Sequence, residues 1–157
     1  MTDENASSTN NGWYFEKDGK TIGPISKSEI ERLLTDTQVG LCFDVAHVAL
    51  AGGEPIRAFH DWLERVNHVH IKDVRTAVFE QAVASGRTDF DEWWEQLSVP
   101  LGTGDLPVAE FAATVAESGY AGWVVVEQDR APVTPETLPV AIADQIHNLQ
   151  WLSAKLA

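Results

Sequence analysis

The sequence has one cysteine, few basic side chains and no long apolar run, and each shortage excludes a class of protein. Cys42 is the only cysteine in 157 residues, which excludes an internal disulfide and a thiolate metal cluster. Lys and Arg number 11 against 24 acidic residues, and the net charge of −13 disfavours nucleic acid and anionic membrane surfaces as partners. No apolar run approaches the roughly 20 residues that span a bilayer, and the acidic, polar start is unlike a signal peptide. We therefore expect a soluble, cytoplasmic protein.

The first 37 residues differ in character from the rest. Residues 1–11 are polar after Met1 and predict a disordered tail. The aromatic run at 13–15, followed by Asp18-Gly19, predicts a β-hairpin within 12–24. Ser26 with Glu29 three residues later is the pattern of a helix start. We expect residues 12–37 to form a small hairpin segment and a junction helix.

From residue 38 the pattern predicts an α/β fold. Apolar runs at 39–43, 66–71 and 122–127 indicate three strands, which we expect to be covered on both faces. Helices are predicted from 54, at 74–97 with a break near Gly86, at 107–118 and at 134–156. This alternation is typical of βαβ units with a parallel sheet. We expect Cys42 to be a buried structural thiol. The expected core includes Trp62, Trp93, Trp94, Trp123 and Trp151, with the alternative that Trp93 and Trp94 line the mouth of a pocket.

An ionisable side chain lies at the end of each predicted parallel strand. Asp44 follows the first strand, the second contains His68 and His70, and Glu127 ends the third. Ligands bind beyond the carboxyl ends of such strands, so these side chains are predicted to converge on a divalent cation such as Mn²⁺, Co²⁺, Mg²⁺ or Zn²⁺. His68 and His70 face the same side of the strand, and periodicity does not choose between them. The competing interpretation of Asp44 alone is a helix cap.

Four segments carry a family resemblance. Residues 39–47, the His-x-His-x-Lys-Asp segment 67–74, the glycine loop 100–105 and the segment 119–129 resemble the xylose-isomerase-like TIM-barrel superfamily of sugar phosphate isomerases and epimerases. Within it, the nearest group resembled is the inosose dehydratases. The resemblance implies that residues 38–157 form the C-terminal part of a TIM barrel, with three parallel strands and their helices. A complete barrel has eight strands in about 250 residues, so the glutamate of the fifth strand, which is the family's fourth metal ligand, lies outside this chain.

The resemblance also implies roles for individual residues. Asp44, His70 and Glu127 match metal ligands, and Glu127 also matches a group that transfers protons. His47 matches a substrate-contacting, catalytic histidine. The implied protein is a truncated, metal-dependent sugar-ketone lyase or isomerase, most like an inosose dehydratase, which dehydrates 2-keto-myo-inositol in inositol catabolism. Mn²⁺ or Co²⁺ is the expected cofactor, with Mg²⁺ and Zn²⁺ as alternatives, and the substrate is a small sugar or cyclitol.

Two further hypotheses come from the N-terminal motifs and from the small number of strands. Residues 12–34 resemble the start of a GYF-like domain, a peptide-binding module, which implies a non-catalytic or degenerate protein that docks a partner through this segment. Alternatively, three open strands leave an unpaired sheet edge, which favours a homo-oligomer or a complementing barrel half. These hypotheses predict docking where the family resemblance predicts catalysis.

Overall fold

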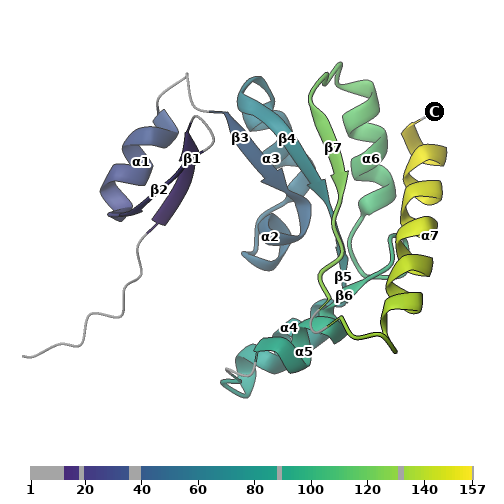
Figure 1. Cartoon of the computed structure of the whole chain (residues 1–157). Coiled ribbons are helices and arrows are strands. Elements are labelled where there is room, and N and C mark those ends of the chain that lie inside the picture. The colour runs from purple at the N-terminus through teal and green to yellow at the C-terminus, as the bar shows by residue number, and fades with distance from the viewer. Residues whose placement is uncertain (1–12, 18–19, 36–39, 88–89, 131–132, 157) are drawn as a thin grey trace, which may run out of the picture. The chain divides into compact units, whose positions relative to one another are not determined.

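The computed structural model describes residues 13–17, 20–35, 40–87, 90–130 and 133–156, and the chain divides into two compact units, 1–39 and 40–157 (Figure 1). In the first unit, β1 (Trp13–Lys17) and β2 (Lys20–Ile25) form an antiparallel hairpin, followed by α1 (Lys27–Thr35). The Ser26 hydroxyl accepts a hydrogen bond from the backbone N–H of Glu29 at 3.2 Å, which caps this helix. The predicted tail 1–11 lies outside the described residues.

A three-stranded parallel sheet organises the second unit. Its strands are β3 (Leu41–Asp44), β4 (Val66–Ile71) and β7 (Trp123–Val126), in the order β3-β4-β7. In Figure 1 the three strands run side by side in the same direction. The sheet and its helices confirm the predicted α/β class with a parallel sheet.

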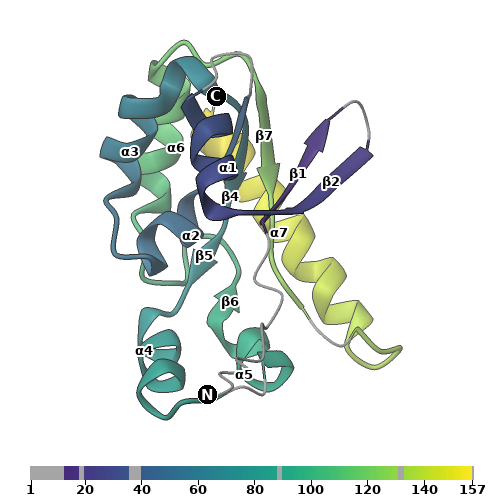
Figure 2. The ribbon, with the colours of Figure 1, turned by 90° about the vertical axis from the view of Figure 1, so that its left-hand side faces the viewer.

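Helices pack on one face of this sheet around a cluster of aromatic rings. Helices α3 (Pro55–Trp62) and α6 (Val108–Glu117) lie on that face (Figure 2), and Leu152 of α7 (Leu138–Leu156) joins their core. Phe43 stacks on Phe111 with ring centroids 5.7 Å apart and meets Phe59 edge-on at 5.6 Å. Phe59 and Phe111 are fully buried, so this face anchors the sheet.

The opposite face of the sheet is open in the described part of residues 40–157. Side chains alternate along a strand, so Phe43 points to the helices and Cys42 points away from them. Cys42 is a free, exposed thiol, and the prediction of a buried one is wrong. Trp123 begins the edge strand β7 and is 73% exposed, so its assignment to the core is also wrong. The predicted cover on both faces is therefore absent from this part of the chain.

The remaining elements lie around the carboxyl end of the sheet, except for a short 3₁₀ turn that directly precedes β4. They are α2 (Val45–Leu50), the short 3₁₀ turn η1 (Leu63–Arg65), α4 (Thr76–Ala84), α5 (Phe90–Leu97) and a two-residue antiparallel ladder of β5 (Asp73–Val74) and β6 (Ser98–Val99). Gly86, at φ +63°, follows the end of α4, which confirms the predicted break.

Two boundaries differ from the sequence prediction. The helix expected from 74 begins at 76, because Asp73 and Val74 pair with β6. The closing helix begins at Leu138 instead of 134, because Thr134 and Thr137 exchange hydrogen bonds between their hydroxyls and backbone N–H groups in a preceding turn. Among the described residues, no helix has the length and apolar character needed to cross a membrane.

Candidate metal site at the carboxyl end of the sheet

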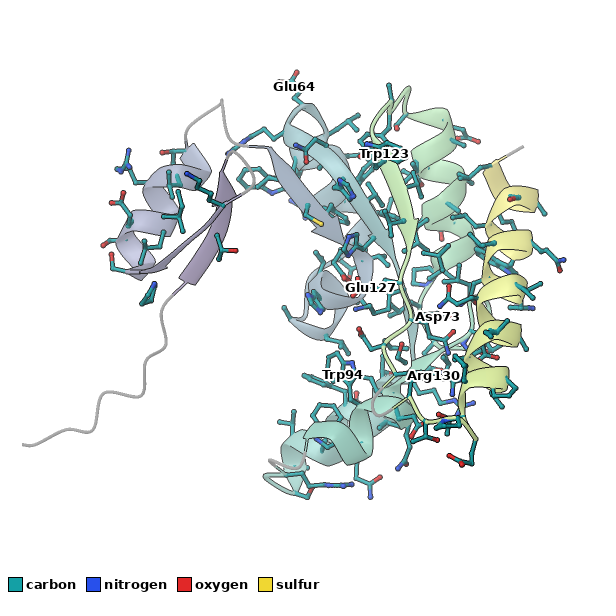
Figure 3. All side chains as sticks on the ribbon, in the orientation of Figure 1. Glu64, Asp73, Trp94, Trp123, Glu127 and Arg130 are labelled. Carbon is teal, nitrogen blue, oxygen red and sulfur yellow. The ribbon has the colours of Figure 1, made fainter. Side chains whose placement is uncertain are left out.

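Asp44, His70 and Glu127 come together at the carboxyl ends of the three parallel strands. One ligand atom from each side chain lies within 4.8 Å of the others. His70 Nδ1 is 2.5 Å from Glu127 Oε2 and 3.8 Å from Asp44 Oδ2. In Figure 3 Glu127 lies toward the end of β7 and Trp123 lies at its opposite end. Of the two histidines in β4, the structure therefore brings His70 into this group.

The backbone register explains this convergence. Asp44 pairs with His70 across the β3–β4 ladder, and His70 pairs with Val125 across the β4–β7 ladder. The backbone N–H of Glu127 then donates to the carbonyl oxygen of Ile71 at 3.1 Å, which continues the ladder beyond β7. In this register, the polar side chains at the carboxyl ends of the three parallel strands lie close together.

Asp44 serves two purposes with its two oxygens. Oδ1 accepts hydrogen bonds from the backbone N–H groups of Ala46 and His47, both at 2.9 Å, and so caps the N-terminus of α2. Oδ2 faces His70. The helix-cap interpretation and the ligand interpretation are therefore compatible, because the cap fixes the carboxylate that faces the cluster.

A buried lysine, which the sequence analysis did not single out, supports the carboxylates of the cluster. Lys72 is 2% exposed, and its Nζ lies 2.7 Å from Asp129 Oδ2, 3.4 Å from Glu127 Oε1 and 3.6 Å from Asp44 Oδ2. Its position two residues after His70, directly beyond the end of β4, was the available signal, since side chains at i and i+2 of an extended chain share a face. Lys72 therefore joins the ligand group to a further carboxylate.

The ionisation of this lysine and its partner follows from burial and charge. Burial lowers the pKa of Lys72, but its ion pairs with Asp129, Asp44 and Glu127 outweigh burial and raise this pKa above its usual value. Burial raises the pKa of Asp129, but the hydrogen bond and charge of Lys72, together with hydrogen bonds involving Trp94 and Glu127, outweigh burial and lower this pKa. Both groups are therefore charged at neutral pH.

A second buried carboxylate holds the glycine loop at this end of the sheet. Asp73 is fully buried, and its Oδ2 accepts hydrogen bonds from the backbone N–H groups of Gly102 and Gly104, both at 2.9 Å. Its Oδ1 accepts from Val74 at 2.9 Å and from Leu106 at 3.2 Å. Burial raises the pKa of Asp73, and these four hydrogen bonds oppose that rise. The backbone N–H groups of Gly102 and Gly104 therefore donate to Asp73 and are not free to bind a phosphate.

His47 lies on α2, three residues beyond Asp44, and is exposed. Its backbone N–H is tied to Asp44. In the described parts of the chain, its imidazole forms no hydrogen bond or ion pair with Asp44, His70 or Glu127. The structure thus places His47 next to the cluster in sequence, and its predicted contact with a substrate stays a prediction.

The donor set fits a single divalent cation. Two carboxylates and one imidazole are ligands that Mn²⁺, Co²⁺, Mg²⁺ and Zn²⁺ accept, with bonds of roughly 2.0–2.6 Å. Ligand atoms within 4.8 Å of one another can all reach one ion at such distances. The side chains of Asp44, His70 and Glu127 are 10%, 28% and 34% exposed, so the position is open to solvent on one side.

The sequence matches the family described as xylose isomerase-like TIM barrel over residues 14–153. The chain belongs to this family. It is 32% identical over 119 residues to an inosose dehydratase of Lactiplantibacillus plantarum. This alignment covers 74% of the chain and 40% of that relative. The chain is 35% identical over 106 residues to the rhizopine catabolism protein MocC of Rhizobium meliloti, which covers 66% of the chain and 33% of that protein.

A solved structure agrees with the fold of this xylose isomerase-like chain. A xylose isomerase domain protein from Planctomyces limnophilus superposes with a TM-score of 0.55 at 24% identity and covers 82% of the chain and 41% of that structure. The chain therefore spans about two fifths of the length of the relatives it matches. The family match confirms the predicted resemblance and the partial-barrel fold class.

Proposed function

We propose that residues 40–157 carry the metal site of a lyase of the inosose dehydratase type, which acts on a sugar ketone or a cyclitol ketone such as 2-keto-myo-inositol. The convergence of Asp44, His70 and Glu127 within 4.8 Å carries this proposal. It is supported by family membership and by similarity to proteins named inosose dehydratase. A cytoplasmic location stays a prediction from the composition.

Each residue of the site has a proposed role in the dehydration. A bound Mn²⁺ or Co²⁺ would polarise the ketone of the substrate and acidify the neighbouring C–H bond. Glu127, which is partly exposed, accepts that proton as a general base and returns it to the hydroxyl on the next carbon, which leaves as water while the C–H electron pair forms the new double bond. His47 contacts the substrate oxygen on which charge develops. Asp44 and His70 hold the cation, and the helix cap on Asp44 fixes its orientation.

The sheet edges and one face of α7 are uncovered among the described residues. Among the described residues, β3 and β7 each pair only with β4, so both have a free edge. On α7, Leu138, Ile142, Ile146 and Leu149 are 46–58% exposed. Their spacing of three and four residues places these four side chains on one face of the helix.

We propose that a five-stranded barrel part covers these surfaces. Eight strands close a TIM barrel, and three are present here, in a chain that spans about two fifths of its relatives. Such a part pairs with β3 and β7, buries the apolar face of α7 and contributes a further metal ligand. It also excludes water and positions the substrate, where a displacement of about 1 Å costs on the order of 100-fold in rate. The resemblance of residues 12–34 to a GYF-like domain remains a hypothesis for a second docking element.

The test is an assay of 2-keto-myo-inositol dehydration with Mn²⁺, with and without the first three fifths of the Lactiplantibacillus plantarum inosose dehydratase as the complementing part. We expect the chain alone to turn over poorly or not at all. We expect the mixture to form a one-to-one complex with activity that Glu127→Gln abolishes. A mixture that forms the complex and binds Mn²⁺ without dehydrating the substrate would show that the proposed reaction is wrong.

Two sets of substitutions test whether the apolar face of α7 binds the complementing part. Ile142→Glu with Ile146→Glu should abolish the complex, whereas Val83→Glu on α4, where Val83 is 64% exposed, should leave it intact. Light scattering after size exclusion measures the masses. A stable dimer of the chain without the added segment would identify a second copy as the occupant and overturn the complementing part.

A further inference from the structure

The carboxylates of Asp44 and Glu127 each face two nitrogen groups, the imidazole of His70 and the ammonium of Lys72. Glu127 directs Oε2 to His70 Nδ1 at 2.5 Å and Oε1 to Lys72 Nζ at 3.4 Å. Asp44 Oδ2 lies 3.8 Å from His70 Nδ1 and 3.6 Å from Lys72 Nζ. Sites that hold two metal ions about 3.5–4 Å apart use shared carboxylates in this manner. One position here is lined by an imidazole, and the other contains an ammonium group.

The position of the ammonium has features of a second cation site. A third carboxylate, Asp129, contacts Lys72 Nζ at 2.7 Å, so carboxylate oxygens from three residues surround the nitrogen. Lys72 is 2% exposed and therefore cannot swing into solvent without moving its neighbours. A charged ammonium has three donors and no lone pair for a metal. Three carboxylates and one ammonium leave a net charge of −2, which one divalent ion neutralises.

We propose that Lys72 is a positioning residue that fills the second cation position of this site, so that the chain binds one divalent ion and not two. This inference rests on the proposed metal site of Asp44, His70 and Glu127. Lys72 holds the two shared carboxylates by charge, and it is hydrogen-bonded to Asp129. Its removal leaves three carboxylates with a net charge of −3 around a cavity of ammonium size.

The experiment counts Mn²⁺ ions on the full chain by equilibrium dialysis and records their electron paramagnetic resonance spectrum. The wild type should bind one Mn²⁺ with the spectrum of an isolated ion. Lys72→Met, whose side chain is one atom shorter and leaves the position of the ammonium nitrogen empty, should bind a second Mn²⁺ with the spectrum of a spin-coupled pair. Lys72→Met with Asp129→Asn should return the count to one, because the second position then loses a carboxylate. Circular dichroism verifies that each variant is folded.

The outcomes separate this inference from the metal site itself. One ion in both the wild type and folded Lys72→Met would overturn the role of Lys72 and leave the proposed metal site standing. No ion in the wild type would overturn the metal site. Lys72→Gln, which retains a donor for Asp129, is the second variant if Lys72→Met does not fold, and it should also gain the second ion. Two ions in the wild type would overturn the inference without any variant.

Discussion

His70 Nδ1 and Glu127 Oε2, from the ends of neighbouring parallel strands, lie 2.5 Å apart. The contact arises because His70 pairs with Val125 in the sheet and the chain continues for two residues to Glu127. Asp44 completes the group from the other side of β4. The strand register, and not any one loop, thus creates the candidate metal site.

Substitutions of Asp44 should separate its two functions. Asp44→Asn keeps Oδ1 as the acceptor for the N–H groups of Ala46 and His47, so we expect little change in the free energy of unfolding and a loss of Mn²⁺ affinity of at least tenfold. Asp44→Ala should lose Mn²⁺ affinity and also about 1 kcal/mol of stability, because the cap is removed. Urea unfolding and calorimetric titration measure the two effects. Equal stability of the two variants would contradict the capping role.

Glu127→Gln should weaken Mn²⁺ binding at least tenfold while the chain stays folded. The substitution replaces a charged oxygen ligand by a neutral amide of the same shape, and the Glu127 side chain is partly exposed. Glu117→Gln, an exposed position at the end of α6, is the matched control and should leave affinity unchanged. Unchanged affinity in Glu127→Gln would remove this residue from the ligand set.

Asp73→Asn should destabilise the chain by about 3 kcal/mol. The carboxylate is fully buried and accepts four backbone hydrogen bonds, and an amide NH₂ group placed there would face N–H donors. Asp61→Asn on α3, whose carboxylate is 62% exposed, is the control and should change stability by less than about 0.5 kcal/mol. Urea unfolding provides the comparison. A loss below about 1 kcal/mol at Asp73 would show that the carboxylate does not hold the glycine loop.

Much of the sheet could be predicted from apolar runs with polar ends. The strand predicted at 66–71 matches β4, and Asp44, His70 and Glu127 could be nominated because each follows or ends such a run. The same runs suggested cover on both faces, and here the sequence misled. Whether a strand is covered depends on which other strands and helices surround it, and exposed Cys42 and Trp123 show that the described chain lacks that cover.

Other features depend on contacts that no local pattern encodes. The pairing of β5 with β6 involves two residues on each side, which is too short for a visible alternation. The ion pairs of Lys72 with Asp129 and Glu127 require the register between β4 and β7. The role of Asp73 requires the approach of a loop that begins almost 30 residues later in the chain. The sequence shows that these residues are ionisable and lie near strand ends, but it does not show which residues they contact.

The most direct test of the account is a calorimetric titration of Mn²⁺ into the wild-type chain, His70→Gln and His68→Gln. Both histidines lie on β4 and their rings are 5.8 Å apart, but only His70 belongs to the three-residue group. We predict that the wild type and His68→Gln bind Mn²⁺ with affinities within a few-fold of each other, and that His70→Gln binds at least tenfold more weakly. Equal affinity in all three proteins, or no binding by the wild type, would contradict a metal site formed by Asp44, His70 and Glu127.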